Sequence, residues 1–243
     1  MNRRQMQILA NRYRILQERE IKQNRKEFER VFIEFGKDIE TQLNKDDWIT
    51  INYTNLINGL KRALINVFQR SSKKSIHWTR TLFGWKLENS DINAITDKAL
   101  NEYNRKYAGD KIKGIGESTK SIINNIITNG QADGLTAKQI KDSIVNKVQE
   151  MSASRAMTIA RTETSNAINI TTHNTAEYSG MTKKTWIHIG GGKEDRAAHL
   201  AIDGKTMGID EYFIVNGYQC LYPHDSNLPA SEVINCYCIC IYE

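Results

Sequence analysis

Proline is nearly absent from this 243-residue sequence, and both prolines, Pro223 and Pro229, lie near its C-terminal end. Proline interrupts a helix because it lacks the backbone N–H and because its ring clashes with the preceding turn. Nothing ahead of residue 223 stops a helix in this way. We therefore expect the long N-terminal part of the chain to be free to form helices.

Long apolar runs are missing as well, and cysteine is missing from most of the chain. No stretch of about 18 uncharged apolar residues could span a membrane. The N-terminus lacks the apolar core of a signal peptide, so we expect a protein made and kept in a cytosol. A reducing compartment favours free thiols or a metal over disulfides. The cysteines are confined to the last 24 residues: Cys220, Cys236, Cys238 and Cys240.

The formal net charge of +6 is concentrated at the N-terminus. Residues 1–30 hold nine Lys or Arg against four Glu, a net of +5. Such a basic arm is the electrostatic footprint expected of nucleic-acid contact, and a solvated basic helix face is the alternative. The candidate DNA-binding residues are Arg3, Arg4, Arg12, Arg14, Arg19, Lys22, Arg25 and Lys26.

Apolar residues at three- and four-residue steps predict helices along most of the chain. The first spans residues 3–44, with a break allowed near Ile21, and must pack on later helices or on a partner. The second runs through Phe68, and its N-cap is one of four candidates: Asp46, Asp47, Asn52 or Thr54. Residues 71–88 have no clean period and predict an irregular connection.

Later helices are marked by caps and glycines. Ser90 or Asp91 begins a helix that Gly109 ends, and residues 117–128 form another that stops at Gly130. Thr136 and Gln139 have capping-box spacing, which predicts a helix start at residue 137. A separate final helix is expected from Ser152 or Ser154 to Ser179, with Gly180 in the left-handed position after its end.

After residue 180 the pattern changes to short strand-like runs over residues 184–189, 212–215 and 233–242, with a loop at residues 190–192. The expected fold class is α+β, with a mainly α-helical N-terminal region and a small C-terminal α+β module. The expected divisions are residues 1–110, a helical leader with the basic arm; residues 111–180, helices leading into the module; and residues 181–243, the module.

Two groups of side chains suggest chemistry. Arg161 and Glu163, mid-helix, predict a buried Arg–Glu arrangement that orients the module through a salt bridge. Arg196 and His199 are three residues apart and would point from one helix face toward Asp203, where histidine can do acid–base work or be a hydrogen-bonded structural residue.

The clustered cysteines have two interpretations. Cys236, Cys238 and Cys240 alternate along an expected strand, so their side chains would share one face. Cys220 and His224 would complete a metal site by folding back, but structural zinc ligands usually lie two to four residues apart, whereas these cysteines are separated by one. We expect buried free thiols and no metal.

An ordered set of motifs runs through the second half of the chain: Ala160 to Glu163, Gly180, Lys184 and Trp186, Arg196 and His199, Asp203 and Gly204, Pro223 and Asp225, and Asn235 to Cys238. This set resembles the Mu F-like family of phage minor head proteins, also called phage head morphogenesis proteins. The resemblance covers about residues 115–240. Within this family pattern we expect mainly structural roles for Arg161, Thr162, Glu163, Lys184, Trp186, Arg196, His199, Asp203, Gly204, Pro223, Asp225, Asn235, Cys236 and Cys238.

The resemblance implies a low-copy virion protein of the head interior or portal vertex, assembled in the host cytoplasm. It implies a role in head morphogenesis, DNA packaging or genome delivery. The implied partners are the portal protein or capsid interior, phage double-stranded DNA and other copies of the chain, with no membrane.

Some relatives carry toxin domains after the module. This chain ends five residues after Cys238, so we expect no appended enzyme, no catalytic residues and no cofactor. The alternative is an effector enzyme packaged in the head that uses Arg161, Glu163 and His199. A free-standing DNA-binding regulator ranks last because no helix-turn-helix pattern stands out.

Overall fold

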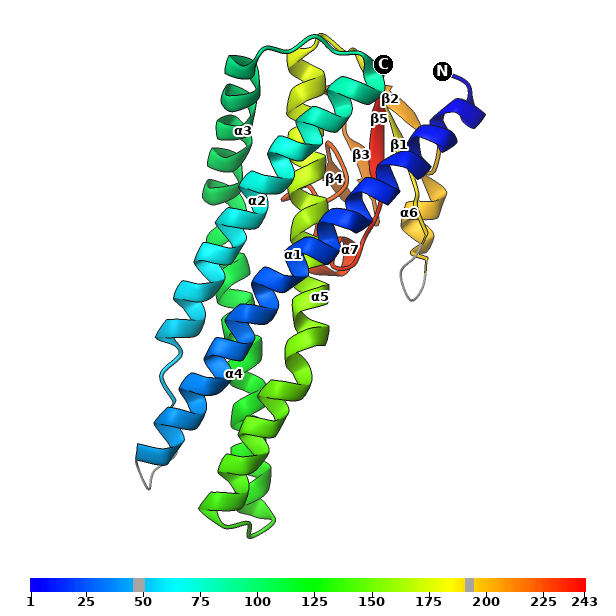
Figure 1. The fold of residues 1–243 in the computed structure, drawn as a ribbon. Helices are drawn as coiled ribbons and strands as arrows, with labels where there is room; N and C mark the ends of the chain where they lie inside the picture. The colour runs from blue at the N-terminus through cyan, green and yellow to red at the C-terminus, as the bar shows by residue number, and fades with distance from the viewer. Residues whose placement is uncertain (46–50, 191–194) are drawn as a thin grey trace.

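The computed structural model describes residues 1–45, 51–190 and 195–243. Long helices run side by side, and short strands lie against one end of them (Figure 1). This confirms the predicted α+β class, mainly helical with a small C-terminal module. The long helices are α1 (Arg3–Lys45), α2 (Thr54–Phe83), α3 (Asn89–Tyr103), α4 (Gly109–Ala132) and α5 (Ala137–Tyr178).

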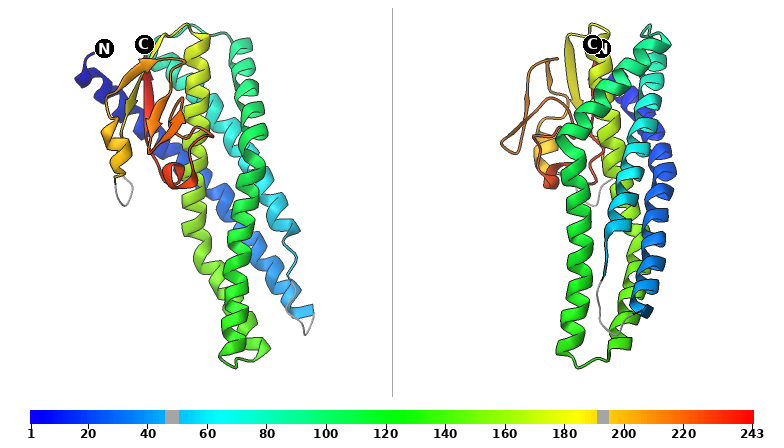
Figure 2. Two further views of the ribbon diagram at one scale, coloured as in Figure 1. Left: turned by 180° about the vertical axis from the view of Figure 1, so that it is seen from behind. Right: turned by 90° about the vertical axis from the view of Figure 1, so that its left-hand side faces the viewer.

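The module is built on the C-terminal half of α5 (Figure 2). In the described residues its main sheet has the order β2-β1-β5, with β1 paired antiparallel to both neighbours. A hairpin, β3-β4, stands beside it. The module contains β1 (Lys183–Ile187), α6 (Ala197–Ala201), β2 (Thr206–Gly208), β3 (Phe213–Val215), β4 (Tyr218–Cys220), α7 (Ala230–Val233) and β5 (Ile239–Tyr242).

The strand predictions hold for position but not for length. The predicted run 184–189 overlaps β1, which ends at Ile187, and the run 212–215 contains β3. The run 233–242 is wrong at its start, because α7 occupies residues 230–233 and β5 begins only at Ile239. Of the predicted loop, Gly190 lies outside any strand, and residues 191 and 192 lie outside the described residues.

The first helix is continuous, so the break allowed near Ile21 does not occur. Ile21 is buried like the other residues of the inner face of α1. That face packs against α2 and α5 and also contacts β1 and β5. This agrees with the prediction that the apolar stripe of the first helix packs on later helices. The basic segment is therefore not a free arm: it is the outer face of a helix whose inner face is buried.

The second helix begins at Thr54, so its cap position is Tyr53 and neither Asn52 nor Thr54, as predicted, occupies it; the Asn52 side chain nevertheless accepts a hydrogen bond from the Thr54 N–H at 2.8 Å. Asp46 and Asp47, the other cap candidates, lie outside the described residues. The predicted end at Phe68 is wrong, because α2 continues to Phe83, and the predicted irregular segment 71–88 is correct only for residues 84–88, which connect α2 to α3. The apolar stripe of α2 stops at Phe68 because mostly polar side chains occupy its buried face beyond that residue.

This polar face belongs to a seam of buried hydroxyl and amide side chains where α1, α2 and α5 meet. Gln17 donates to Ser165 at 2.7 Å, and Asn24 donates to Ser71 at 2.9 Å and to Thr164 at 2.8 Å. We call it the polar seam; its members are Tyr13, Gln17, Asn24, Ser71, Ser72, Ser75, Thr164, Ser165, Thr171 and Thr172. Buried polar groups are tolerated when each finds a partner.

Gly109 and Gly130 do not end helices, contrary to prediction. A π-helical turn, residues 104–108, leads from α3 into α4, and Gly109 has a helical φ of −62°. Gly130 lies inside α4, where an added Cβ would sit 2.7 Å from Cγ1 of Ile140. Glycine at 130 therefore serves the close approach of α4 to α5 rather than a helix stop.

The start and end of α5 are as predicted, but its middle is not. Thr136 and Gln139 form the capping box, and Gly180 has a φ of +73°. Ser152 and Ser154 do not begin a new helix, because their hydroxyls donate to the carbonyls of Gln149 and Met151 within α5. One helix thus connects the far end of the bundle to the module.

We predict that Asn24→Ala destabilises the fold by about 2–3 kcal/mol, because it removes the partner of two buried hydroxyls and of Arg70. Urea unfolding measures the change. Asn11→Ala, on the exposed face of the same helix, is the control and should shift stability by less than about 0.5 kcal/mol. Equal effects of the two substitutions would contradict a structural role for the polar seam.

Candidate functional site

The family-pattern residues gather where α5 meets the segment between α7 and β5. Nη1 of Arg161 donates to Oδ1 of Asn235 at 2.9 Å, and its guanidinium lies 5.2 Å from the ring centre of Tyr237. The Asn235 N–H donates to the Thr162 hydroxyl at 3.2 Å. Asn235 has a φ of +60°, a left-handed conformation that asparagine tolerates better than most residues. Arg161 and Thr162 therefore hold a tight turn of the module against α5.

Glu163 does not pair with Arg161, so the predicted Arg–Glu arrangement is wrong. Its carboxylate is buried, accepts a hydrogen bond from the Tyr103 hydroxyl at 3.0 Å and lies 3.2 Å from Nζ of Lys111. Neighbouring positions of a helix point in different directions, which separates the partners of residues 161 and 163. Glu163 thus ties α5 to α3 and α4, while Arg161 ties it to the module.

Arg196, His199 and Asp203 do not converge either. Arg196 directly precedes α6 and donates to the carbonyls of Ser231 at 2.7 Å and Ile234 at 2.6 Å. Asp203 accepts from the His188 N–H at 2.8 Å and contacts Arg3 at 3.3 Å. The predicted acid–base grouping is therefore wrong, because α6 is a single short turn.

His199 instead lies in a buried cluster with sulfur atoms and a second histidine. Its Nδ1 is 3.3 Å from Sγ of Cys238 and 3.6 Å from Sγ of Cys236. The Nδ1 of His188 is 3.4 Å from the same Cys238 sulfur. We call these four residues the thiol–imidazole cluster. His188 was not predicted from the sequence; it lies just after β1 and two residues beyond Trp186, whose ring packs edge-on against His199 at 5.6 Å.

The two thiols of the cluster differ in acidity. The hydrogen bond shared with Cys238 lowers the pKa of the Cys236 thiol well below its usual range, despite burial, and the contact with His199 acts in the same direction. Burial raises the pKa of the Cys238 thiol, and its bond to Cys236 adds to that increase. Cys236 is therefore the more readily ionised sulfur of the pair.

Among the described residues, Cys220, Cys240 and His224 belong to no converging group of three or more metal-ligating atoms, so the alternative metal set built from Cys220, Cys236, Cys238, Cys240 and His224 is not formed. Burial raises the pKa of Cys240 to about 12 and that of Cys220 further. His224 has its Nε2 3.1 Å from the carbonyl of Cys236. The prediction that three cysteines share one face is confirmed, although only Cys240 belongs to β5: Cys236, Cys238 and Cys240 pack in one apolar cluster with Trp186, whereas the intervening Tyr237, Ile239 and Ile241 pack in another.

The remaining pattern residues shape the module. The buried Lys184 donates to the Ile209 carbonyl at 2.6 Å, and burial lowers its pKa. Asp225 follows Pro223 and accepts from the N–H groups of Leu221 and Asn227 at 2.7 and 3.0 Å, which closes a turn. Gly204 has a φ of +79° and donates to the Trp186 carbonyl at 2.8 Å, a conformation that favours glycine.

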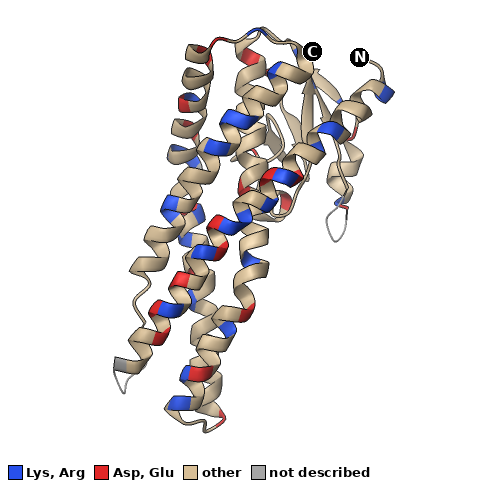
Figure 3. Ribbon diagram, viewed as in Figure 1, with Lys and Arg blue, Asp and Glu red and all other residues tan. Residues whose placement is uncertain are grey.

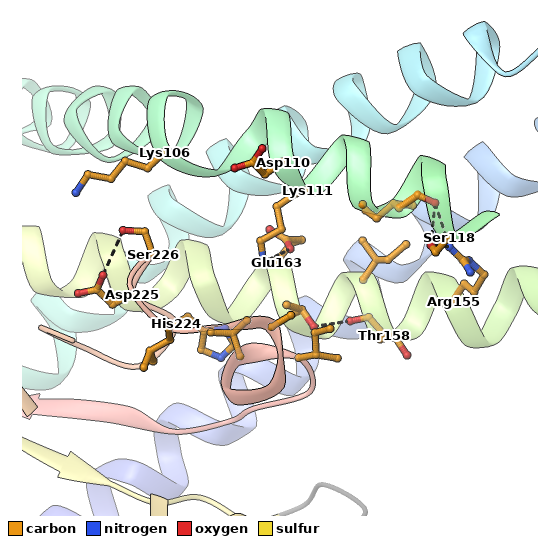
Figure 4. Close-up of a pocket in the computed structure, with 18 of the residues that line it drawn as sticks. Lys106, Asp110, Lys111, Ser118, Arg155, Thr158, Glu163, His224, Asp225 and Ser226 are labelled. Atoms are coloured by element: carbon orange, nitrogen blue, oxygen red, sulfur yellow. Dashed lines mark hydrogen bonds and ion pairs between the residues drawn. The ribbon is translucent and has the colours of Figure 1, made fainter. Parts of the chain in front are cut away.

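A cavity of about 690 Å³ opens between α4, α5 and the segment that follows Tyr222 (Figure 4). Its wall carries charges of both signs. Lys111 points toward Glu163 across the cavity, and Asp225 and Arg155 lie toward opposite ends (Figure 4). A ligand bound in this cavity would contact both carboxylates and cations. The lining therefore does not select for a ligand of either charge.

The candidate DNA-binding residues divide into two groups on α1. Arg3 pairs with Asp203, Arg14 with Glu18 and Arg25 with Glu29. The other five are exposed, make no ion pair among the described residues, and fall within a sector of about 80° at 3.6 residues per turn. We call them the basic stripe: Arg4, Arg12, Arg19, Lys22 and Lys26. Lys and Arg recur along the exposed side of α1 in Figure 3.

The sequence also has recognisable relatives. Residues 121–241 match the family described as "Phage Mu protein F like protein". The protein YqbB of Bacillus subtilis is 31% identical over 126 residues, which are 50% of this chain and 41% of that protein. The NAD(+)–arginine ADP-ribosyltransferase EFV of Enterococcus faecalis is 32% identical over 154 residues, 60% of this chain and 31% of that protein. The chain thus spans less than half the length of these curated relatives, and no solved structure matches.

Two substitutions at Asn235 separate its backbone role from its side-chain role. Asn235→Ala should destabilise the fold by about 2–3 kcal/mol, because it loses the Arg161 bond and also strains the left-handed backbone. Asn235→Gly loses only the bond and should cost at least about 1 kcal/mol less. Equilibrium unfolding in urea compares the two, and an equal loss would mean that the φ of +60° contributes nothing.

Proposed function

We propose, since residues 121–241 belong to the family of phage Mu protein F like proteins, that this chain acts as a minor head protein of a bacteriophage. In this proposal it serves head morphogenesis, DNA packaging or genome delivery. Its module docks on the portal protein or capsid interior, and α1 faces the packaged DNA. The match of half the chain to that family is the observation that carries the proposal.

The basic stripe supports contact with DNA. It extends from Arg4 to Lys26, which is about 33 Å along a helix at 1.5 Å per residue. Its side chains are exposed and face away from the buried side of α1. Cations in such a row can neutralise successive phosphates and release counterions, which gives binding without sequence preference. The three paired arginines, by contrast, are already engaged within the fold.

The β3-β4 hairpin supports docking through the module. It exposes large apolar side chains, with Tyr212, Ile214 and Tyr218 each more than two-fifths accessible. Exposed apolar groups gathered on one element are typical of protein contact surfaces. Among the described helices, none is long and apolar enough to cross a bilayer. A protein partner is therefore the occupant that we propose for the hairpin.

The arrangement of side chains favours this function over an effector enzyme. Arg161, Glu163 and His199 each have separate partners: Asn235 for the first, Tyr103 and Lys111 for the second, and Glu232 and Cys238 for the third. One relative bears the name of an ADP-ribosyltransferase, but the alignment covers 31% of that protein. We therefore propose that the chain acts without catalysis.

We predict that the triple variant Arg12→Glu, Arg19→Glu and Lys22→Glu binds double-stranded DNA at least 10-fold more weakly at low salt. The slope of log affinity against log salt, about −4 to −5 if all five cations contact phosphates, should flatten by about 3. Fluorescence anisotropy over a salt series measures both quantities.

The control reverses Lys113, Lys120 and Lys138, three exposed lysines that belong to α4 and α5 rather than to α1. It changes the net charge equally and should bind nearly as the unchanged chain does. Equal losses in the two triple variants would remove the basic stripe from the proposal.

Incorporation into phage particles tests the docking part. The chain should appear in DNase-treated heads by mass spectrometry, cross-linked to a portal or capsid protein. Tyr212→Asp combined with Ile214→Asp should lower its copy number several-fold, whereas Leu135→Asp, at an exposed position on the α4–α5 turn, should not. Absence of the unchanged chain from both heads and precursor shells would overturn the proposed function.

A further inference from the structure

The thiol–imidazole cluster has a geometry that buried thiols alone do not require. Ligand atoms of His188, His199 and Cys238 all lie within 4.8 Å of one another, and the Cys236 sulfur adjoins His199 Nδ1 at 3.6 Å. The residues come from three separate segments: the residue that follows β1, the short helix α6 and the segment that leads into β5. Two soft sulfur and two imidazole donors thus converge on one small buried volume.

We propose that this cluster binds a divalent zinc ion through Nδ1 of His188, Nδ1 of His199 and the sulfurs of Cys236 and Cys238. Two cysteines and two histidines are a common donor set for zinc, and a site with four protein ligands is closed and structural rather than catalytic. The proposal concerns how the module keeps its shape and is independent of the proposed function.

The separations between donors fit a tetrahedral ion. Zinc–sulfur bonds of about 2.3 Å and zinc–nitrogen bonds of about 2.05 Å at a tetrahedral angle place sulfur and nitrogen about 3.6 Å apart. The observed separations between sulfur and Nδ1 are 3.3, 3.4 and 3.6 Å. An ion at the centre would therefore require shifts of only a few tenths of an ångström along these contacts.

The far side of each imidazole provides a second, independent observation. The Nε2 of His199 is 3.0 Å from a carboxylate oxygen of the buried Glu232, whose other oxygen accepts from Asn216 at 3.1 Å. The Nε2 of His188 lies 3.2 Å from Oδ1 of Asp195. A carboxylate at the outer nitrogen favours the proton there and turns the Nδ1 lone pair inward, which is the usual support of a metal-bound histidine.

The position of the cluster gives the ion a structural task. The strands of the main sheet are only three to five residues long, and α6 has five residues. Short elements of this kind bury little apolar surface, and a metal can supply the missing folding energy. The ion would join α6 to the approach to β5, and thereby keep Asn235 and Tyr237 in place against Arg161.

Metal binding by the full chain tests the proposal. Reduced protein treated with a chelator should take up one Zn²⁺ per chain by elemental analysis, and the metal should raise its thermal midpoint. Co²⁺ in place of zinc should give the intense visible bands of a tetrahedral site and a near-ultraviolet thiolate band. A chain that is folded by circular dichroism, with free thiols, and that binds neither metal would overturn the proposal.

Variants identify the ligands and separate them from merely buried cysteine. Cys238→Ser and His188→Gln should weaken zinc binding at least 100-fold, and Cys236→Ser should halve the thiolate band. Cys240→Ser changes an equally buried thiol outside the cluster and should retain the Co²⁺ spectrum. If Cys240→Ser and Cys238→Ser lose metal equally while both stay folded, the cluster is not the site.

Glu232→Gln tests the carboxylate behind His199 as a positioning residue. It keeps the size of the side chain and an oxygen for Asn216 while removing the negative charge. Zinc affinity should fall 10- to 100-fold, with the Co²⁺ band shape unchanged. An unchanged zinc affinity would show that Glu232 does not support a bound ion and would remove the second observation from the proposal.

Discussion

The structure depends on the burial of one helix on nearly all sides. In α5, every position from Thr162 to Ala176 is buried, and most of these residues are polar. A helix that is covered all round usually carries apolar side chains, since an unpaired buried polar group costs free energy. Here α1 and α2 supply hydroxyl and amide partners through the polar seam, while the module supplies partners on the other side. The register of three helices is thereby fixed by hydrogen bonds, which are directional, rather than by apolar contact alone.

The pattern residues of α5 have partners in both the bundle and the module. Arg161 and Thr162 face the turn at Asn235, Glu163 faces Tyr103 and Lys111, and Asn169 donates to the carbonyl of Cys238 at 3.1 Å. A single helix therefore sets the position of the bundle and of the module together. A change at one of these residues would disturb both parts, because no flexible linker separates them.

Much of the fold could be predicted from local signals. The capping box at Thr136, the left-handed Gly180 and the shift to short strands are each encoded within a few residues. The continuation of α2 was missed because Ser71, Ser72 and Ser75 resemble a connection until the hydroxyls of α5 are placed opposite them. The same limit applies to the site: Cys236 and Cys238 were visible as a pair, but His188 and Glu232 join them only through the tertiary fold.

The order of strands has a consequence for synthesis of the chain. Strand β1 lies at the centre of its sheet, yet its partner β5 follows more than 50 residues later, and both contact α1. The inner face of α1 leaves the ribosome long before α5 and β5 exist to cover it. Contacts between distant parts of a chain form slowly, and transiently exposed apolar faces promote aggregation. Until α5 and β5 have been synthesised, α2 is the first element that can pack against the apolar face of α1. Phe28, Phe32 and Phe35, which are buried in the folded chain, are therefore only partly covered during synthesis.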